Sequence, residues 1–206
     1  MKFLILGAGM QGRACAFDLL QNPVTRSVIL ADSSNENLEL ARRLLKSKKV
    51  TLARADASDV GKVHRLARGL DVMISAVPYF FNLNLAKTAI AARVHFVDLG
   101  GNTSIVLKEL ALGPAAAKAG VTILPDVGLG PGMTTTLAVH GMSQLDSVSE
   151  VFIRDGGLPQ KPRPPMNYLL TFSEHGLINE YVENATALRD GKRIEVRGLS
   201  EIETIE

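Results

Sequence analysis

The chain has 206 residues, 46% of them hydrophobic, and its 23 basic and 21 acidic residues leave a net charge of +2. This length is enough for one full core and the start of a second, because a domain usually holds about 100 to 200 residues. The charges are interspersed, so no basic face indicates nucleic acid or membrane lipid as a partner. No apolar stretch approaches the roughly 20 residues that span a bilayer, and the apolar opening is too short for a signal peptide. We therefore expect a cytoplasmic protein.

A glycine-rich turn follows the first apolar run directly. Gly7, Gly9 and Gly12 have the G-x-G-x-x-G spacing of a dinucleotide-binding turn between a strand and a helix. Gly7 allows a sharp turn, Gly9 leaves no side chain between backbone and pyrophosphate, and Gly12 lets the helix pack close to the sheet. We expect this turn, with Met10 and Gln11, to bind the pyrophosphate of a dinucleotide.

The second apolar run ends at Asp32, 20 residues beyond Gly12 (32 − 12 = 20). A carboxylate in this position can accept hydrogen bonds from both adenosine ribose hydroxyls, and its charge repels a 2′-phosphate. The next residues, at 33–35, offer no Arg that would hold a phosphate. NAD is therefore predicted over NADP. The alternative is that Asp32 is only a cap or turn residue at a strand end.

Apolar runs and helical patterns alternate as far as about residue 142, which is typical of a parallel sheet covered on both faces. After a first strand at 2–6, further strands are predicted at 28–31, 50–53, 71–75, 94–97 and 121–124. Helices are predicted near 13–20, 36–46, 59–68 and 82–92, and over 103–119 with a break at 113–114. Right-handed crossovers then give an α/β fold, a doubly wound (Rossmann) parallel sheet with strand order 3-2-1-4-5-6, in a dinucleotide-binding domain over 1–145.

Local signals add detail to the first two helices. Ala14, Phe17 and Leu20 lie at helical spacing in the first, and a capping box between residues 33 and 36 can begin the second. Cys15 is the single cysteine, so no internal disulfide can form, and we expect it to be a small core residue.

Ligands of doubly wound sheets bind beyond the carboxyl ends of the strands, so the residues that follow each strand are candidate site residues. The alternative is that these segments are plain turns, since Gly, Pro, Asn and Asp end strands for conformational reasons alone. The candidates for cofactor binding are Asp56 and Ala57 after the third strand, Ala76, Val77 and Pro78 after the fourth, and Gly100 after the fifth; Asp126 follows the sixth.

The pattern changes beyond residue 148, where we expect the first part of a second, α+β substrate or dimerisation domain over 146–206. Strands are predicted at 150–154 and 168–172, a helix near 177–182, and a hairpin that turns at Asp190-Gly191. Fewer than about 60 residues make a marginal domain. We therefore expect either a homo-oligomer formed through this domain or a longer protein that completes it.

Four segments together resemble the saccharopine dehydrogenase superfamily, and most closely its lysine 6-dehydrogenase branch: residues 98–102, 125–133, 156–159 and 177–181. The resemblance covers essentially the whole chain, whereas family members continue well past this length. It implies NAD(P)-dependent oxidation of an amine on an amino-acid substrate, foremost the terminal amine of lysine. A hydride leaves the carbon that bears the nitrogen, an imine forms, and water releases the aldehyde.

The resemblance also implies site residues. Asp126 is the first candidate to bind or deprotonate the amine, although a plain turn carboxylate is an equal alternative. Tyr168 and His175 are alternatives from the second domain, the turn at Gly157 shapes the cleft for the substrate, and Arg154 can pair a substrate carboxylate. We expect no metal, because no His/Cys cluster has metal-ligand spacing.

Two other functions stay open at this point. The fold could bind NAD and report its redox state without chemistry, as a regulatory sensor. An enzyme of the same superfamily could instead oxidise saccharopine or a polyamine-related substrate. An assay for amine-dependent NADH formation separates the sensor from the enzymes.

Overall fold

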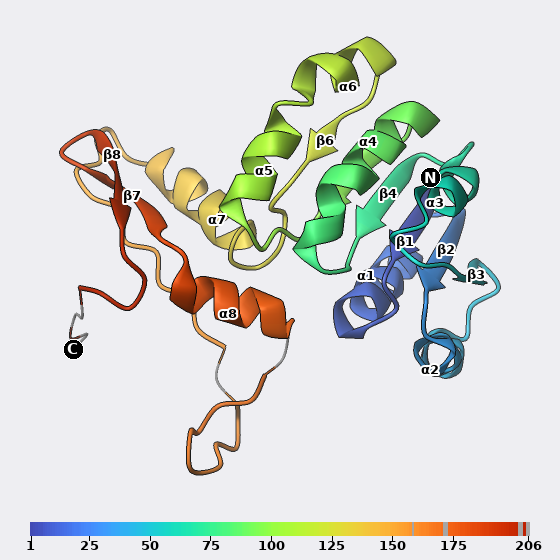
Figure 1. Cartoon of the computed structure of the whole chain (residues 1–206), viewed down its shortest axis with the longest axis horizontal. Helices are drawn as coiled ribbons and strands as arrows, with labels where there is room; N and C mark the ends of the chain where they lie inside the picture. Colours follow the sequence, from blue (N-terminus) through green and yellow to red (C-terminus); the bar gives the residue numbers. More distant parts are fainter. Residues whose placement is uncertain (158, 171–172, 202–203, 205–206) are drawn as a thin grey trace. The chain divides into compact units, whose positions relative to one another are not determined.

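The computed structural model describes residues 1–157, 159–170, 173–201 and 204 (Figure 1). These residues form two compact units, Met1–Asp155 and Gly156–Glu206.

The first unit is built on a six-stranded sheet with the order β3-β2-β1-β4-β5-β6, and neighbouring strands pair in parallel (Figure 1). This is the predicted order, so the doubly wound fold is confirmed. The sixth strand is shorter than predicted. The strands are β1 (Lys2–Leu6), β2 (Ser27–Asp32), β3 (Val50–Arg54), β4 (Val72–Ser75), β5 (His95–Asp98) and β6 (Ile123–Leu124).

Helices cover both faces of this sheet. Alternation along β1 sends Phe3 and Ile5 into one core, with residues of α1 and α2, and Leu4 and Leu6 into a second core, with residues of α3 and α4. Successive side chains of a strand point to opposite faces, so an unbroken apolar run is what a sheet covered on both sides requires. The helices are α1 (Met10–Gln21), α2 (Asn35–Leu45), α3 (Val60–Ala67), α4 (Asn82–Ala92), α5 (Thr103–Leu110), α6 (Gly113–Ala119) and α7 (Met133–Met142), with a 3-10 turn at Tyr79–Phe81.

The first two helices form as predicted, and two of their details differ from the local patterns in the sequence. Helix α1 buries Gly12 and Ala16, whereas Phe17 is 58% exposed, because the close contact of Gly12 with the strand end turns that side of the helix to the sheet. Helix α2 is capped by Ser34, whose hydroxyl accepts the N–H of Asn37 at 3.3 Å. The predicted capping box, which begins one residue earlier, is therefore not the observed cap.

The second unit contains α8 (Glu174–Val182) and an antiparallel hairpin of β7 (Ala185–Arg189) and β8 (Lys192–Val196). Asp190 and Gly191 join the two strands with φ of 50° and 69°, as the predicted tight turn requires. The strands expected at 150–154 and 168–172 do not form at 150–154 or 168–170, and residues 171 and 172 lie outside the described part. A strand needs a partner for its backbone groups, and within the described residues these segments pair with none.

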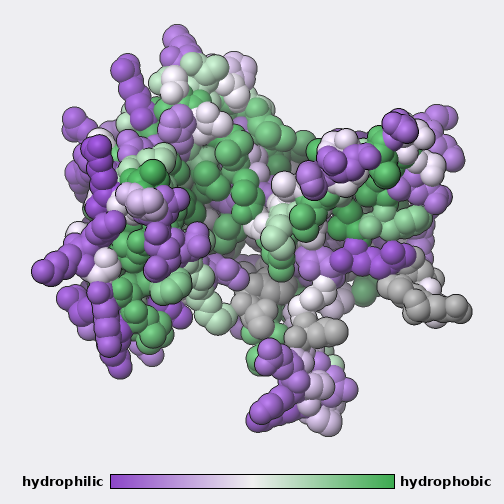
Figure 2. Space-filling model, turned by 180° about the vertical axis from the view of Figure 1, so that it is seen from behind, coloured by the Kyte–Doolittle hydropathy of each residue, from purple (hydrophilic) through white to green (hydrophobic). Residues whose placement is uncertain are grey.

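Hydrophilic residues (purple) cover much of the surface seen in Figure 2, with hydrophobic residues (green) exposed between them. Helix α7 contributes to the exposed apolar surface through Met133, Leu137 and Val139. In the described part of the chain, no helix combines the length and apolarity that crossing a membrane requires. Cys15 is half-buried against the core beside α1 and α2, and burial raises the pKa of its thiol.

Candidate active site

The fold itself requires two of the three glycines in the β1–α1 turn. Gly7 has a φ of +96°, and a Cβ there would lie 2.5 Å from the carbonyl oxygen of Ala76. A Cβ on Gly12 would lie 1.8 Å from the carbonyl oxygen of Gly7. Both contacts are far shorter than a van der Waals distance. Only glycine at these two positions therefore allows strand β1, strand β4 and helix α1 to pack this closely.

Gly9 differs, because no contact within the protein requires glycine at this position. Its φ of −67° suits any residue, and a Cβ there would meet no protein atom within 4 Å. Helix α1 begins at the next residue, Met10, and no side chain caps it. The first N–H groups of a helix have no acceptor inside the helix and carry its positive end. Open space beside free N–H groups fits the pyrophosphate of a dinucleotide.

Asp32 holds this turn from the end of β2. Its Oδ2 accepts the N–H of Ala8 at 2.6 Å, and its Oδ1 accepts the N–H of Ser34 at 2.7 Å. Each oxygen of the carboxylate thus already accepts one backbone N–H, and the contact of Asp32 with a ribose stays a prediction. Arg54 is the register partner of Asp32 on the neighbouring strand, and its side chain is exposed. Arg54 was not predicted from the sequence, because the pairing of parallel strands brings together residues that are far apart in the chain.

The other residues predicted to contact the cofactor lie at the same edge of the sheet. Asp56 and Ala57 follow β3, and the carboxylate of Asp56 accepts both the N–H and the hydroxyl of Ser58, which lowers its pKa. Ala76, Val77 and Pro78 follow β4. Because the strands are parallel, these residues lie at the same edge of the sheet as the glycine turn. Their contacts with a cofactor stay predictions.

The loops after β5 and β6 interlock. A Cβ on Gly100 would lie 2.0 Å from Oδ1 of Asp126, and one on Gly128 would lie 2.8 Å from the carbonyl oxygen of Leu99. Asp98 ties the loops together, because its Oδ1 accepts the N–H of Gly100 at 2.7 Å and that of Asp126 at 3.3 Å. The carboxylate of Asp126 is therefore held between two glycine-rich loops, at a residue whose own φ is 62°.

Three carboxyl groups, those of Asp98, Glu109 and Asp126, lie close to one another at these loops. Asp98 and Glu109 are fully buried, and Asp126 is half-buried. Burial is the main cause that raises the pKa of each, and the Asp98 charge raises the pKa of the other two further, to about 8 for Glu109. The ion pairs Arg42–Glu39 and Arg189–Glu201 lie elsewhere. In the described part of the chain, no group of three or more His, Cys, Asp or Glu side chains is arranged to hold a metal ion.

A buried polar chain extends the cluster into the core. Asn82 at the start of α4 is a hydrogen-bond partner of Asp98, and its Oδ1 accepts the hydroxyl of Ser75 at 2.7 Å. Ser75 is the last residue of β4 and is 1% exposed, and Asn82 is 2% exposed. The ends of β4, β5 and β6 are thus linked by side chains and not by the sheet alone.

The residues predicted to bind the substrate lie apart in the sequence. Arg154 is exposed near the end of the first unit, with its guanidinium 5.3 Å from the ring centroid of Phe152. Gly157, Tyr168 and His175 belong to the second unit. Their roles stay predictions.

Sequence reasoning missed two acidic residues at this edge. Glu109 follows the buried Val106 by three residues, so a charged residue on the buried stripe of α5 was the signal that could have identified it. Asp155 lies against the loop after β6, since a Cβ on Gly130 would be 1.9 Å from its Oδ2. No local pattern in the sequence indicates that contact.

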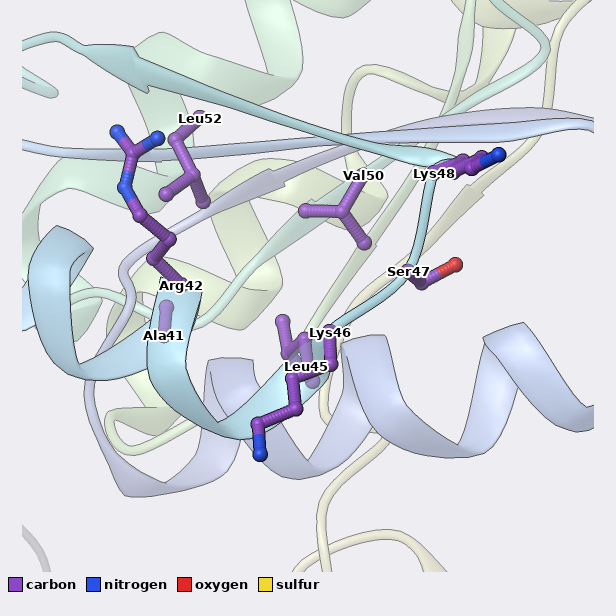
Figure 3. Close-up of a pocket in the computed structure, with 8 residues that line it drawn as sticks. All are labelled: Ala41, Arg42, Leu45, Lys46, Ser47, Lys48, Val50 and Leu52. Atoms are coloured by element: carbon purple, nitrogen blue, oxygen red, sulfur yellow. The ribbon is translucent and has the colours of Figure 1, made fainter.

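A separate pocket lies between the second half of α2 and the amino end of β3, away from the carboxyl edge (Figure 3). In Figure 3 the ammonium groups of Lys46 and Lys48 point away from each other, so they do not converge on one ligand. We therefore place this pocket outside the candidate site. It is lined by Ala41, Arg42, Leu45, Lys46, Ser47, Lys48, Val50 and Leu52.

Comparisons with known proteins agree with this geometry. A family model described as "Saccharopine dehydrogenase NADP binding domain" matches residues 3–124, and one described as "Saccharopine dehydrogenase C-terminal domain" matches residues 128–205. The apo structure of saccharopine dehydrogenase (L-Glu forming) from Saccharomyces cerevisiae has a TM-score of 0.68 and 24% sequence identity, over 95% of this chain and 44% of that one.

Two curated relatives show how much of a longer protein the chain spans. Saccharopine dehydrogenase (NADP(+), L-glutamate-forming) from Saccharomyces cerevisiae is 27% identical over 195 residues, which are 92% of this chain and 42% of the relative. Mitochondrial alpha-aminoadipic semialdehyde synthase from Mus musculus is 26% identical over 204 residues, 96% of this chain and 21% of the relative. The family description and the yeast name specify NADP, against the NAD preference predicted from Asp32. The first family model alone covers more than half of the chain, which therefore belongs to the saccharopine dehydrogenase family and contains its NAD(P)-binding domain.

Proposed function

We propose that this chain forms the cofactor-binding and proton-transfer part of an NAD(P)-dependent oxidoreductase that acts on the amine of a saccharopine-type amino acid. The observation that carries the proposal is that the open space at Gly9 and the held carboxylate of Asp126 lie at the same edge of one sheet. The names of the relatives supply the substrate class. Bound NAD(P) would supply the hydride acceptor.

Asp126 suits the task of taking a proton from the substrate. An amine of an amino acid is protonated at neutral pH and must lose a proton before its carbon can give up a hydride. Burial, and then the negative charge of Asp98, raise the pKa of Asp126, which makes it a stronger proton acceptor. Its backbone N–H is fixed by Asp98, and the N–H of Gly101 donates to its carboxylate.

Asp126→Asn tests this role in the full-length enzyme. We expect kcat with saccharopine to fall by about 100-fold, the usual cost of losing a positioned acid–base group, while dinucleotide affinity changes by less than about twofold. Steady-state kinetics and a dinucleotide titration measure the two. Asp146→Asn, which removes an exposed carboxylate outside the site, is the matched control. Unchanged turnover in Asp126→Asn would exclude this residue from the mechanism.

For the cofactor we favour NADP, and two contacts support that choice besides the names of the relatives. The N–H groups of Ala8 and Ser34 partly compensate the charge of Asp32, which weakens its repulsion of a 2′-phosphate. Arg54 lies opposite Asp32 in the register, with an exposed guanidinium that can pair a phosphate. NAD is the alternative, favoured by the carboxylate itself.

Arg54→Ala distinguishes the two cofactors. If Arg54 pairs the 2′-phosphate, we expect NADP affinity to fall about tenfold, and NAD affinity to change by less than about twofold, because a charge-assisted pair contributes about 1.4 kcal/mol or more. Arg68→Ala, at the end of α3, is the control for loss of a surface arginine. Calorimetric titration with both dinucleotides gives the ratio. Binding of NAD tenfold tighter than NADP by the unmodified chain would favour the interpretation from Asp32 alone.

Oxidation of the terminal amine of lysine is the second candidate function, supported by the resemblance of residues 156–159 and 177–181 to the lysine 6-dehydrogenase branch. Comparing reduced dinucleotide formed from saccharopine with that formed from lysine separates the two. Absence of turnover with either substrate, together with tight dinucleotide binding, would instead favour the sensor.

A further inference from the structure

The carboxyl groups of Asp98 and Glu109 lie close enough to hydrogen-bond to each other if one of them is protonated. Both residues are 0% exposed, so water does not reach them. Oδ2 of Asp98 and both Oε atoms of Glu109 find no donor among the N–H and O–H groups of the described residues. Two ionised carboxylates cannot bond to each other, and leaving them buried together would cost a large desolvation and repulsion penalty. One of the two must carry a proton and donate it.

Asp98 is the better acceptor of the pair. Its Oδ1 already accepts two backbone N–H groups, from Gly100 and Asp126, and hydrogen bonds of this kind stabilise the ionised form. Glu109 accepts no comparable N–H, so the same burial leaves its neutral form favoured. The proton therefore belongs on Glu109, and the negative charge on Asp98.

We propose that Glu109 is a protonated positioning residue, whose carboxyl O–H holds Asp98 and thereby fixes the loop that carries Asp126. The chain of contacts is short: Glu109 donates to Asp98, and Asp98 accepts the N–H of Asp126 at 3.3 Å. The catalytic part of this inference rests on the proposed function, because it takes Asp126 as the proton acceptor. The location of the proton does not depend on that function.

The groups that face Glu109 come from three directions. Asp98 at the end of β5 and Asp126 after β6 both act on it with negative charge and raise its pKa. Helix α4 packs against α5 and contributes the neutral Asn82 to the same network, whereas its Lys87 is exposed. Loss of the Glu109 proton would thus place a second charge beside Asp98, and the Asp126 loop should respond to it.

Amide NMR signals of Gly100 and Asp126 test the proton directly, because both N–H groups bind Oδ1 of Asp98. We expect these signals in the 206-residue chain to titrate with a midpoint near pH 8. Glu109→Gln, which keeps a neutral donor of the same shape, should abolish that titration. Glu36→Gln, which removes an exposed carboxyl of α2, is the matched control and should preserve it. The same titration in Glu109→Gln, or none in the unmodified chain, would overturn the assignment of the proton.

Kinetics of the full-length enzyme test the positioning role. We expect Glu109→Ala to lower kcat about tenfold or more, with dinucleotide KM changed by less than about twofold, and Glu109→Gln to restore most of the loss. Full turnover in both variants would overturn the positioning role. If Glu109→Ala does not fold, the pH profile of Glu109→Gln decides, since it should lack the fall in kcat above about pH 8. An inactive parent enzyme would refute the proposed function and leave the NMR result to decide the proton.

Discussion

Glu109→Gln is expected to make the chain more stable than the unmodified protein at alkaline pH, and to flatten the dependence of its stability on pH. The folded state holds the Glu109 proton with a pKa of about 8, whereas an exposed glutamate has the ordinary value of 4.5. Between these values the native chain binds a proton that the unfolded chain has released. The contribution of Glu109 to stability therefore falls as pH rises through this range and does not change further above it.

The expected effect is large. Each pH unit in the range costs about 1.4 kcal/mol, so the whole range costs roughly 5 kcal/mol, a large fraction of the 5–15 kcal/mol that stabilises a typical domain. Glutamine cannot ionise, so the variant should escape this cost while it resembles protonated glutamate in shape. Below about pH 5 the two proteins should unfold at similar denaturant concentrations, and the gap should widen up to about pH 8.

Urea unfolding across this pH range measures the difference, and Glu36→Gln again controls for loss of a carboxyl. Asp98 and Asp126 also have raised pKa values, so the difference between the unmodified protein and the variant is more informative than either curve alone. Parallel curves for the two proteins would show that Glu109 is ionised in the folded state.

Gly9→Ala is expected to abolish most dinucleotide binding and to leave the fold intact. The protein has room for the new methyl group, since nothing lies within 4 Å of it, and the backbone angle is ordinary. The same methyl group would occupy the space in which the pyrophosphate approaches the first N–H groups of α1. We expect affinity to fall on the order of 100-fold, or about 2.7 kcal/mol.

Two further glycines make this test specific. Gly141→Ala, in α7, also adds a methyl group in open space, and should lower neither stability nor binding. Gly12→Ala should instead lower stability itself, because its Cβ would meet the Gly7 carbonyl at 1.8 Å. Denaturant unfolding and the thermal shift produced by saturating dinucleotide separate these outcomes. Undiminished binding in Gly9→Ala would place the cofactor elsewhere.

Structural features that depend on short stretches of chain were predicted correctly from the sequence. The apolar runs of the strands, the glycine spacing of the first turn and the Asp190-Gly191 hairpin each follow from short stretches of chain. The order of the parallel strands follows from right-handed crossovers, and it placed the predicted cofactor residues at one edge. The predicted strands do not form at 150–154 or 168–170, because extended backbone becomes a strand only when a partner accepts its hydrogen bonds, which a local pattern does not report.

The sequence by itself therefore determined the family, the sheet and the edge at which a dinucleotide would bind, because glycine spacing and apolar periodicity act over a few residues. Only the tertiary structure decided how charges meet at that edge. It placed Arg54 beside Asp32 across two strands, and it joined Asp98, Glu109 and Asp126 from a strand end, a helix and a loop. The pKa of a carboxyl depends on burial and on neighbours within a few ångströms, and these three lie up to 28 residues apart in the chain.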